Sequence, residues 1–239
     1  MKMKLMSMIA VAMLVLNANA QTSGKINPGG IYIKGGYNAS NISVNSNGSV
    51  DNSKTLGTFH AGVIADLPLA DMFSIQTGLL LNGKGAKANY YLDNNNTSDN
   101  YVKTRFNPLY LELPANFVLK FPLGNDLRLY AGAGPYAAMG VGGTSKIESS
   151  FAGVKSSSSN DIKFNDDNPT TSEQEGSRFD RLKRFDIGFN GLAGIETNRF
   201  MLGLNYGLGL TKINSTQTNN SADDKNKYRI WSVSLGVRL

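Results

Sequence analysis

The chain contains no cysteine, so disulfides and thiolate metal sites are excluded together. Its only histidine is His60. The acidic run at residues 165–168 does not have the spacing of a calcium-binding loop. The glycine clusters at residues 132–134 and 140–143 precede no helical pattern and predict no nucleotide-binding loop. We therefore expect no metal and no cofactor.

Long apolar runs are missing as well. Beyond the N-terminal segment, nothing approaches the ~20 consecutive apolar residues of a membrane-spanning helix. There is also no block of Lys and Arg of the kind that binds nucleic acid, so no nucleic-acid partner is expected. If this chain crosses a membrane, it must do so with β-strands.

The N-terminal segment has the layout of a secretory signal peptide. Lys2 and Lys4 precede an apolar run from Leu5 to Leu16, and the small-x-small sequence of residues 18–20 comes before Gln21. We predict a signal peptide at residues 1–20 and one mature domain at residues 21–239. Removing the peptide lowers the formal net charge from +6 to +4.

What is abundant is a side-chain alternation with a period of two. Between Met201 and Lys212, Leu and Tyr at even positions alternate with Gly, Asn and Thr at odd positions, which is typical of a β-strand. Similar patterns predict eight strands: Gly30–Ser43, Phe59–Leu67, Phe73–Asn82, Leu109–Phe121, Leu127–Gly140, Phe185–Glu196, Met201–Lys212 and Trp231–Leu239. Pro114 and Pro135 interrupt two of these strands and predict β-bulges there.

The connections between these strands alternate in length. Three are tight turns, at Pro68–Met72, Pro122–Asp126 and Thr197–Arg199. The others are long polar loops, at residues 45–56, 85–103, 146–183 and 214–226. Short turns on one side and long loops on the other are typical of outer-membrane barrels. We therefore expect extracellular loops, and an even strand count places both termini in the periplasm.

Alternation alone does not say which face points inward, and a soluble lipocalin-type barrel has the same period. The polar face here is mostly Gly, Asn, Ser and Tyr, whereas a solvated exterior carries many charges. Aromatic residues also cluster near both ends of the apolar band, as in membrane-interface girdles. We predict an all-β fold: a transmembrane antiparallel up-and-down β-barrel of about eight strands, surrounded by outer-membrane lipid.

Four segments resemble the PorT-like outer-membrane β-barrel family of Gram-negative bacteria. They are Phe59–Val63, Leu111–Ala115, Leu129–Pro135 and Phe189–Glu196. The resemblance covers the whole mature chain. It implies a small barrel in the outer membrane, some of whose relatives assist protein secretion, and it implies no catalytic residues.

Nine ionisable side chains project onto the predicted lumen: Lys34, His60, Asp66, Glu112, Lys120, Arg128, Asp186, Glu196 and Arg238. Apart from His60, four are basic and four are acidic. The balance favours a paired network that plugs a narrow barrel, because charges removed from water need partners. The alternative is a selectivity ring in a thin pore.

These observations favour a non-enzymatic surface protein with a structural, adhesion or secretion and assembly role. Its specificity would lie in the loops, chiefly at residues 146–183. The expected partners are the barrel-insertion machinery and an envelope protein that binds through the loops. The alternatives are a narrow, porin-like solute channel and a lipid-modifying enzyme centred on His60, although His60 has no recognisable partner motif.

Overall fold

The computed structural model describes residues 29–43, 53–91, 100–124, 126–164, 181–213 and 226–239. The predicted signal peptide and nearly all of the predicted loop at 214–226 lie outside these residues. No described segment forms a helix with the length and apolarity needed to span a membrane. The strands are β1 Gly30–Ile42, β2 Ser53–Lys54, β3 Leu56–Ala70, β4 Phe73–Gly83, β5 Ala86–Tyr91, β6 Tyr101–Pro122, β7 Arg128–Phe151, β8 Val154–Asp161, β9 Lys163–Phe164, β10 Arg181–Leu182, β11 Phe185–Glu196, β12 Phe200–Gly209 and β13 Tyr228–Arg238.

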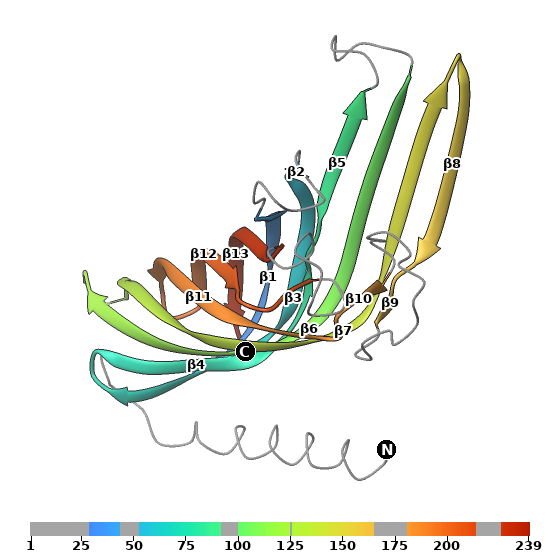
Figure 1. Cartoon of the computed structure of the whole chain (residues 1–239). Helices are drawn as coiled ribbons and strands as arrows, with labels where there is room; N and C mark the ends of the chain where they lie inside the picture. Colours follow the sequence, from blue (N-terminus) through green and yellow to red (C-terminus); the bar gives the residue numbers. More distant parts are fainter. Residues whose placement is uncertain (1–28, 44–52, 92–99, 125, 165–180, 214–225) are drawn as a thin grey trace.

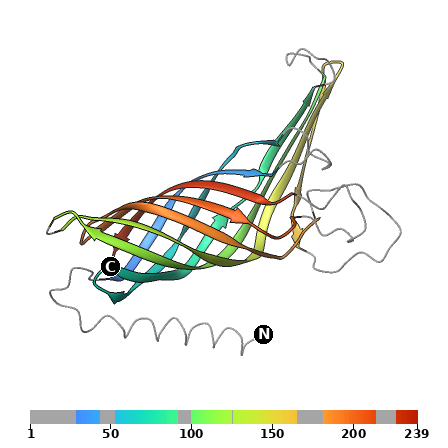
Figure 2. The same cartoon turned by 60° about the vertical axis from the view of Figure 1, so that its left-hand side comes forward.

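Eight strands close into a barrel. They run in the order β1, β3, β4, β6, β7, β11, β12 and β13, each antiparallel to the next, and β13 pairs with β1 to complete the ring (Figures 1 and 2). Closure pairs the backbone groups of every ring strand on both sides, which a spanning sheet needs because lipid offers no hydrogen-bonding partner. The predicted eight-stranded barrel is confirmed.

The two faces of the barrel wall have opposite chemistry. On β12, Leu202 and Leu204 are 48% and 57% exposed on the outer surface, whereas Met201 and Gly203, which alternate with them, are buried. Aromatic side chains predicted for the two girdles are also exposed on the outside: Phe59, Phe73, Phe121, Phe185 and Trp231. An apolar exterior around a polar interior is the inverse of a soluble barrel. The apolar face therefore points outward, as predicted.

The sheet that forms the ring also extends beyond it. β6 has 22 residues and β7 has 24, so at ~3.3 Å per residue each is far longer than the other ring strands. Past the ring they pair with β5 and β8, and β2 pairs with β5. We call this five-stranded projection, in the order β2, β5, β6, β7, β8, the external sheet (Figure 1).

The external sheet corrects the loop assignment. The ranges 85–103 and 146–183 contain β5, the first residues of β6, the last residues of β7, and all of β8, β9 and β10. The prediction failed because these segments are too short or too polar to show a hydrophobic alternation. In β8, for example, four consecutive serines give no hydrophobic alternation, and every residue is exposed.

The predicted bulges at Pro114 and Pro135 are wrong. Pro114 pairs with Tyr136, and the pairing resumes in the same register at Phe117 and Ala133. The prolines, which lack a backbone donor, are thus accommodated by a short gap in the ladder instead of an inserted residue. The register of β6 and β7 does shift between Leu109 and Tyr110, where the external sheet begins. Gly143 lies next to this shift with a φ of 143°, a conformation that favours glycine.

The three tight turns lie at one end of the barrel. β3 turns into β4, β6 into β7 and β11 into β12 at this end, where β13 also finishes (Figure 2). The external sheet leaves from the opposite end. The two ends of the barrel are therefore different in construction, and the charged side chains of the lumen lie between them.

Candidate functional site

Near the turn end, four charged side chains from four strands form a buried cluster. Lys120 on β6 makes ion pairs with Asp66 on β3 and with Glu196 on β11, the latter at 2.8 Å. Arg128 on β7 reaches Glu196 at 3.2 Å, and the hydroxyl of Tyr32 donates to the same carboxylate at 3.3 Å. Two cations and two carboxylates compensate one another here. We call this group the lower ion cluster.

A second cluster lies toward the other end and is centred on Lys84, which is fully buried. Its Nζ is 3.0 Å from Glu112 Oε2 and 2.8 Å from Asp186 Oδ2. The ring of Tyr136 lies beneath the ammonium group, with 4.3 Å between Nζ and the ring centroid, and the Tyr136 hydroxyl donates to Asp186 at 3.0 Å. Carboxylates and aromatic faces together replace the water that a buried ammonium group loses. We call this group the upper ion cluster.

A chain of amide side chains connects the upper ion cluster to His60. Asn82 donates to Glu112 Oε2 at 2.9 Å, and Asn38 donates to Asn82 Oδ1 at 2.8 Å. The oxygen of Asn38 accepts from His60 Nδ1 at 2.7 Å, and this places the imidazole proton on Nδ1 because an amide oxygen cannot donate. His60 thus hydrogen bonds with an amide and not with a carboxylate. The contact orients the ring but supplies no acid partner for a hydrolase-type triad.

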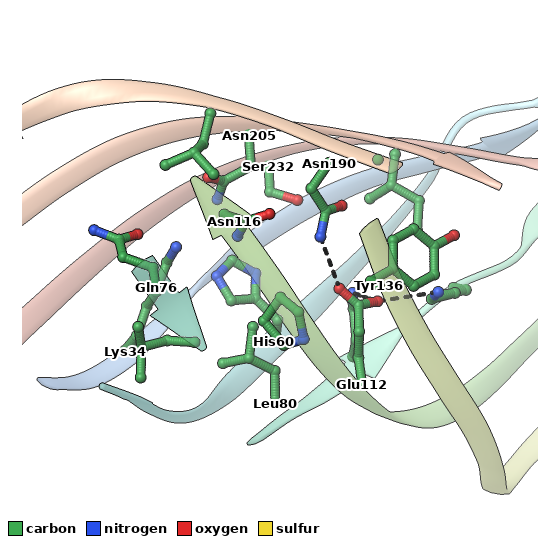
Figure 3. A pocket seen from close by; sticks show the side chains of 17 residues that line it. Lys34, His60, Gln76, Leu80, Glu112, Asn116, Tyr136, Asn190, Asn205 and Ser232 are labelled. Carbon is green, nitrogen blue, oxygen red and sulfur yellow. Dashed lines mark hydrogen bonds and ion pairs between the residues drawn. The ribbon is translucent and has the colours of Figure 1, made fainter. Parts of the chain in front are cut away.

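A small cavity separates the two ion clusters. It has a volume of about 50 Å³, and its lining includes Lys34, His60, Gln76, Asn116 and Ser232 (Figure 3). Because a single water needs roughly 10–15 Å³ of such volume, the cavity holds only a few waters. Among the described residues, His60 Nε2 and Asn116 Oδ1 have no side-chain or backbone partner. A few internal waters would satisfy them.

Apolar side chains fill the lumen where the external sheet begins. Phe106 of β6 and Ala86 and Ala88 of β5 are buried there. Segments from outside the ring add to this cluster, with Ile162 next to β9, Leu182 in β10 and Ile213. The ring of Phe164 packs edge-on against Tyr110, with 5.4 Å between their centroids. We call this group the apolar cap.

The structure places eight of the nine predicted lumen residues in three groups and leaves Arg238 apart from them. Asp66, Lys120, Arg128 and Glu196 meet in the lower ion cluster, and Glu112 and Asp186 meet in the upper one. Lys34 and His60 line the cavity between the clusters. Arg238 is only half-buried at the turn end and makes no ion pair within the described residues.

Sequence reasoning missed Lys84, the centre of the upper ion cluster. The side-chain alternation already indicated its direction. Gln76, Leu80 and Asn82 point inward at even positions, and Lys84 is the next even position. The predicted strand ended at Asn82, so Lys84 was left outside it. Asn38 and Asn82 were also missed as network members, because only ionisable side chains were considered.

This arrangement pairs the carboxylates of the barrel interior with cations. Within the described residues, no three His, Asp or Glu side chains lie close enough together to hold a metal ion. Each lumen carboxylate named above has a cationic partner at ion-pair distance. The geometry is that of a filled barrel interior.

Fold and lumen together define a transmembrane β-barrel with a closed ring, an apolar belt and a polar, filled interior. Residues 19–215 match the model of the family described as "Outer membrane protein beta-barrel domain". The chain belongs to this family, and its location is the bacterial outer membrane.

Several solved outer-membrane proteins are similar to this chain at low identity. The attachment invasion locus protein Ail of Yersinia pestis, solved with the heparin analogue sucrose octasulfate, is 15% identical, with 88% of this chain and 99% of Ail covered and a TM-score of 0.40. Neisserial surface protein A is 11% identical, with coverages of 87% and 97% and a TM-score of 0.40. The N-terminal β-barrel domain of Pseudomonas aeruginosa OprF is 12% identical, with coverages of 86% and 97% and a TM-score of 0.31. No curated protein matches the sequence.

Proposed function

We propose that this protein is a non-conducting, non-enzymatic outer-membrane barrel that carries the external sheet at the cell surface. The role that fits is structural, adhesive or associated with secretion and assembly. The observation that carries the proposal is the contrast between a filled lumen and an enlarged exterior. The interior holds a cavity of about 50 Å³, whereas β6 and β7 continue well past the ring.

Three groups of side chains along the lumen oppose the conduction of solutes. The lower ion cluster joins β3, β6, β7 and β11 across the lumen. The upper ion cluster joins Lys84 to β6 and β11, and the apolar cap fills the end beyond it. Moving these groups aside would leave buried charges unpaired, at a cost of several kcal/mol each.

The orientation is part of the proposal. Outer-membrane barrels keep short turns in the periplasm and larger elements outside. On that rule the β3–β4, β6–β7 and β11–β12 turns and both termini are periplasmic, and the external sheet is extracellular. The resemblance to PorT-like barrels supports a role beside a secretion or assembly system. The partners proposed are the barrel-insertion machinery and an envelope protein that binds the exterior.

The absence of cysteine permits a direct test of orientation. Val154, at the start of β8, is 73% exposed, and Arg199 lies exposed in the β11–β12 turn. A membrane-impermeant maleimide added to intact cells should label Val154→Cys and not Arg199→Cys. Both variants should react after lysis. Labelling of Arg199→Cys alone on intact cells would reverse the orientation.

Conductance separates the sealed barrel from a narrow channel. Purified wild-type protein in a planar lipid bilayer should show no stable conductance steps. Reproducible ohmic steps from wild type would establish the channel and reject the proposal. Glu112→Ala serves as an internal comparison, because it removes a carboxylate that pairs with Lys84 and accepts from Asn82. We expect it to loosen the lumen and to be the variant that conducts.

Lipid analysis tests the non-enzymatic part of the proposal. Outer-membrane lipid from cells that produce wild type and His60→Ala should have the same acyl-chain composition. His60 is 4% exposed, and its Nδ1 is already engaged with Asn38. Deacylated lipid that appears with wild type and disappears with His60→Ala would identify an enzyme.

A further inference from the structure

The external sheet carries a row of cations that runs across its strands. In the pairing register, Lys54 of β2 lies opposite Lys87 of β5, Lys87 lies opposite Arg105 of β6, and Arg105 lies opposite Lys146 of β7. Directly opposite residues on neighbouring strands share one face of a sheet. With strands about 4.8 Å apart, four cations thus line up over roughly 14 Å. We call this line the cation row.

The cation row lies on the outer face of the molecule. Arg105, Leu109 and Leu113 are spaced four residues apart on β6 and therefore lie on the same face of the strand. Leu113 is 53% exposed on the apolar belt, so this is the outer face. The opposite face at the same level carries Phe106, which packs in the apolar cap. Lys54, Arg105 and Lys146 are exposed, and Lys87 is half-buried. The row is therefore open to the medium.

Further cations flank the row on the same face. Lys103 is two residues from Arg105 on β6 and so lies on the same face. Lys155 of β8 lies opposite Ser150 of β7, which lies opposite Tyr101 of this face. The acidic residues of this face within the described residues are Glu148 and Asp161. Like charges in directly opposite positions destabilise a sheet. The adjacent cations repel one another and so reduce the stability of the sheet. An anionic ligand bound on this face would neutralise that repulsion.

A hollow in this face collects these side chains. It has a volume of about 320 Å³ and is lined by Lys87, Asn89, Lys103, Thr104, Arg105, Lys146 and Glu148. Lys146 Nζ is 2.8 Å from Glu148 Oε1, and both side chains are exposed to solvent. Hydrogen bonding and charge from Lys146 lower the pKa of Glu148, so this carboxylate is ionised at neutral pH and competes with any ligand for Lys146.

We propose that the outer face of the external sheet binds an anionic polysaccharide outside the membrane, laid along the cation row. An extended sugar chain advances by about one strand spacing per pyranose ring, so one charged group per ring meets one strand. Tyr101 adds an aromatic ring on the same face, with Lys103 Nζ 4.0 Å from its centroid. Sugar rings pack against such a surface through their C–H groups.

Two other occupants fit this surface less well. Single-stranded nucleic acid is bound by a series of aromatic platforms along its path, whereas the aromatic positions of this face within the described strands are Tyr101 and its register partner Tyr91, both at one level. Lipid head groups lie directly above the apolar belt. The cation row stands four residues beyond Leu109, roughly 13 Å further along the strand. The medium, and not the lipid surface, is what the row faces.

The test uses the full-length mature protein in neutral detergent, with fluorescent dextran sulfate as the probe. Lys87→Gln/Arg105→Gln removes two charges from the row. Lys163→Gln/Arg199→Gln removes two exposed charges from other parts of the molecule and is the matched control. Wild type should bind dextran sulfate, and should bind more weakly at higher salt because exposed charges are screened. The row variant should bind about tenfold more weakly, which corresponds to two exposed ion pairs of ordinary strength, and the control should match wild type.

Glu148→Gln gives an independent readout, because it should tighten dextran sulfate binding by releasing Lys146. All variants should keep the wild-type gel shift on boiling, which reports the folded barrel. Equal loss in the row and control variants would overturn the proposal, as would equally tight binding of neutral dextran or tighter binding of a single-stranded oligonucleotide. This inference rests on the proposed surface role, but the two are tested by different experiments. Maleimide labelling tests whether the external sheet is at the cell surface, and dextran sulfate binding tests whether that sheet binds an anionic polysaccharide.

Discussion

At the residue scale, the lumen is organised around lysines that each bridge two carboxylates. Lys84 joins Glu112 to Asp186, and Lys120 joins Asp66 to Glu196. Both lysines are buried, so their four ion pairs are screened much less than pairs at the surface. A buried bridge of this kind contributes little relative to a well-packed apolar core, but removing one member leaves uncompensated charge. Removal of one charge from a bridge is therefore expected to destabilise the barrel, although the complete bridge adds little stability of its own.

Lys84→Met should destabilise the barrel by about 3–5 kcal/mol, because Glu112 and Asp186 would face each other without a cation. The measurement is the urea midpoint in detergent, read from the gel shift between folded and boiled protein. Lys146→Met is the matched control. It breaks an exposed ion pair with Glu148 and should cost at most ~1 kcal/mol.

Adding Glu112→Gln to Lys84→Met should recover part of the loss, since one of the two buried charges is removed. Equal urea midpoints for Lys84→Met and Lys146→Met would contradict the bridging role of Lys84.

Glycine at position 203 makes room for an aromatic side chain of the lumen. A Cβ at Gly203 would collide with the hydroxyl of Tyr130, which donates to the carbonyl of Leu202 at 3.3 Å. Gly203→Ala should therefore cost about 1–3 kcal/mol of unfolding free energy by overpacking. Tyr130→Phe removes the colliding oxygen. In a double-mutant cycle the combined variant should be more stable than the sum of the single effects, and strict additivity would sink this explanation.

Sequence could predict the direction of most lumen side chains but not their partners. Alternation alone placed Asp66, Glu112 and Glu196 inward, and all three are at most 4% exposed. It could not reveal that Glu112 shares Lys84 with Asp186, because those residues are 28, 74 and 102 positions apart and meet only after the ring closes. Partner identity is a property of register, and register is set by the whole barrel.

At the element scale, each ring strand has one face toward lipid and the other toward the packed lumen. β12 presents Leu202 and Leu204 outward, and it presents Gly203 toward the hydroxyl of Tyr130 inward. A shift of one residue in register would exchange these faces and bring leucine into the narrow lumen. The same alternation that identifies the strand therefore also excludes a register shift of one residue.

Leu204→Arg tests the outward assignment of β12. Leu204 lies in the middle of the strand and is 57% exposed on the belt, so a charge there should cost about 2–4 kcal/mol in a bilayer. Val154→Arg, at a position 73% exposed on the external sheet, should cost much less. Urea unfolding in lipid vesicles compares the two. Similar losses would mean that the face of β12 bearing Leu204 is not solvated by lipid.

The external sheet marks the limit of prediction from pattern. Its strands lack an apolar stripe, since their outer face is cationic and their inner face carries residues such as Thr104 and Ser149. Hydrophobic periodicity therefore gave no signal between residues 146 and 161. These segments become strands because β6 and β7, already paired in the ring, continue the ladder and offer β5 and β8 an edge.

At the scale of the whole molecule, closure makes the barrel independent of the sheet it carries. All eight ring strands find both neighbours within the ring, so no ring strand relies on β2 or β8 to cover an edge. Within the described residues, the external sheet instead ends in edges with no further strand beside them, at β2 and at β8. Charged and serine-rich residues on these edges oppose pairing between copies of the chain. The molecule thus combines a closed, stable base with an open, polar projection.

This independence predicts that the projection can be removed. Ala88 lies directly opposite Thr104, and Ser145 lies directly opposite Asn160. Replacing residues 89–103 and 146–159 each with Asn-Gly would therefore close two ordinary hairpins and keep Phe106 in the apolar cap. The two hairpins end two residues apart along the β6–β7 ladder, because Ser145 pairs with Phe106 and not with Thr104. The shortened protein should still resist detergent and shift on boiling, with a urea midpoint close to that of wild type. A shortened chain that no longer shifts on boiling would show that the external sheet is needed for the ring to close.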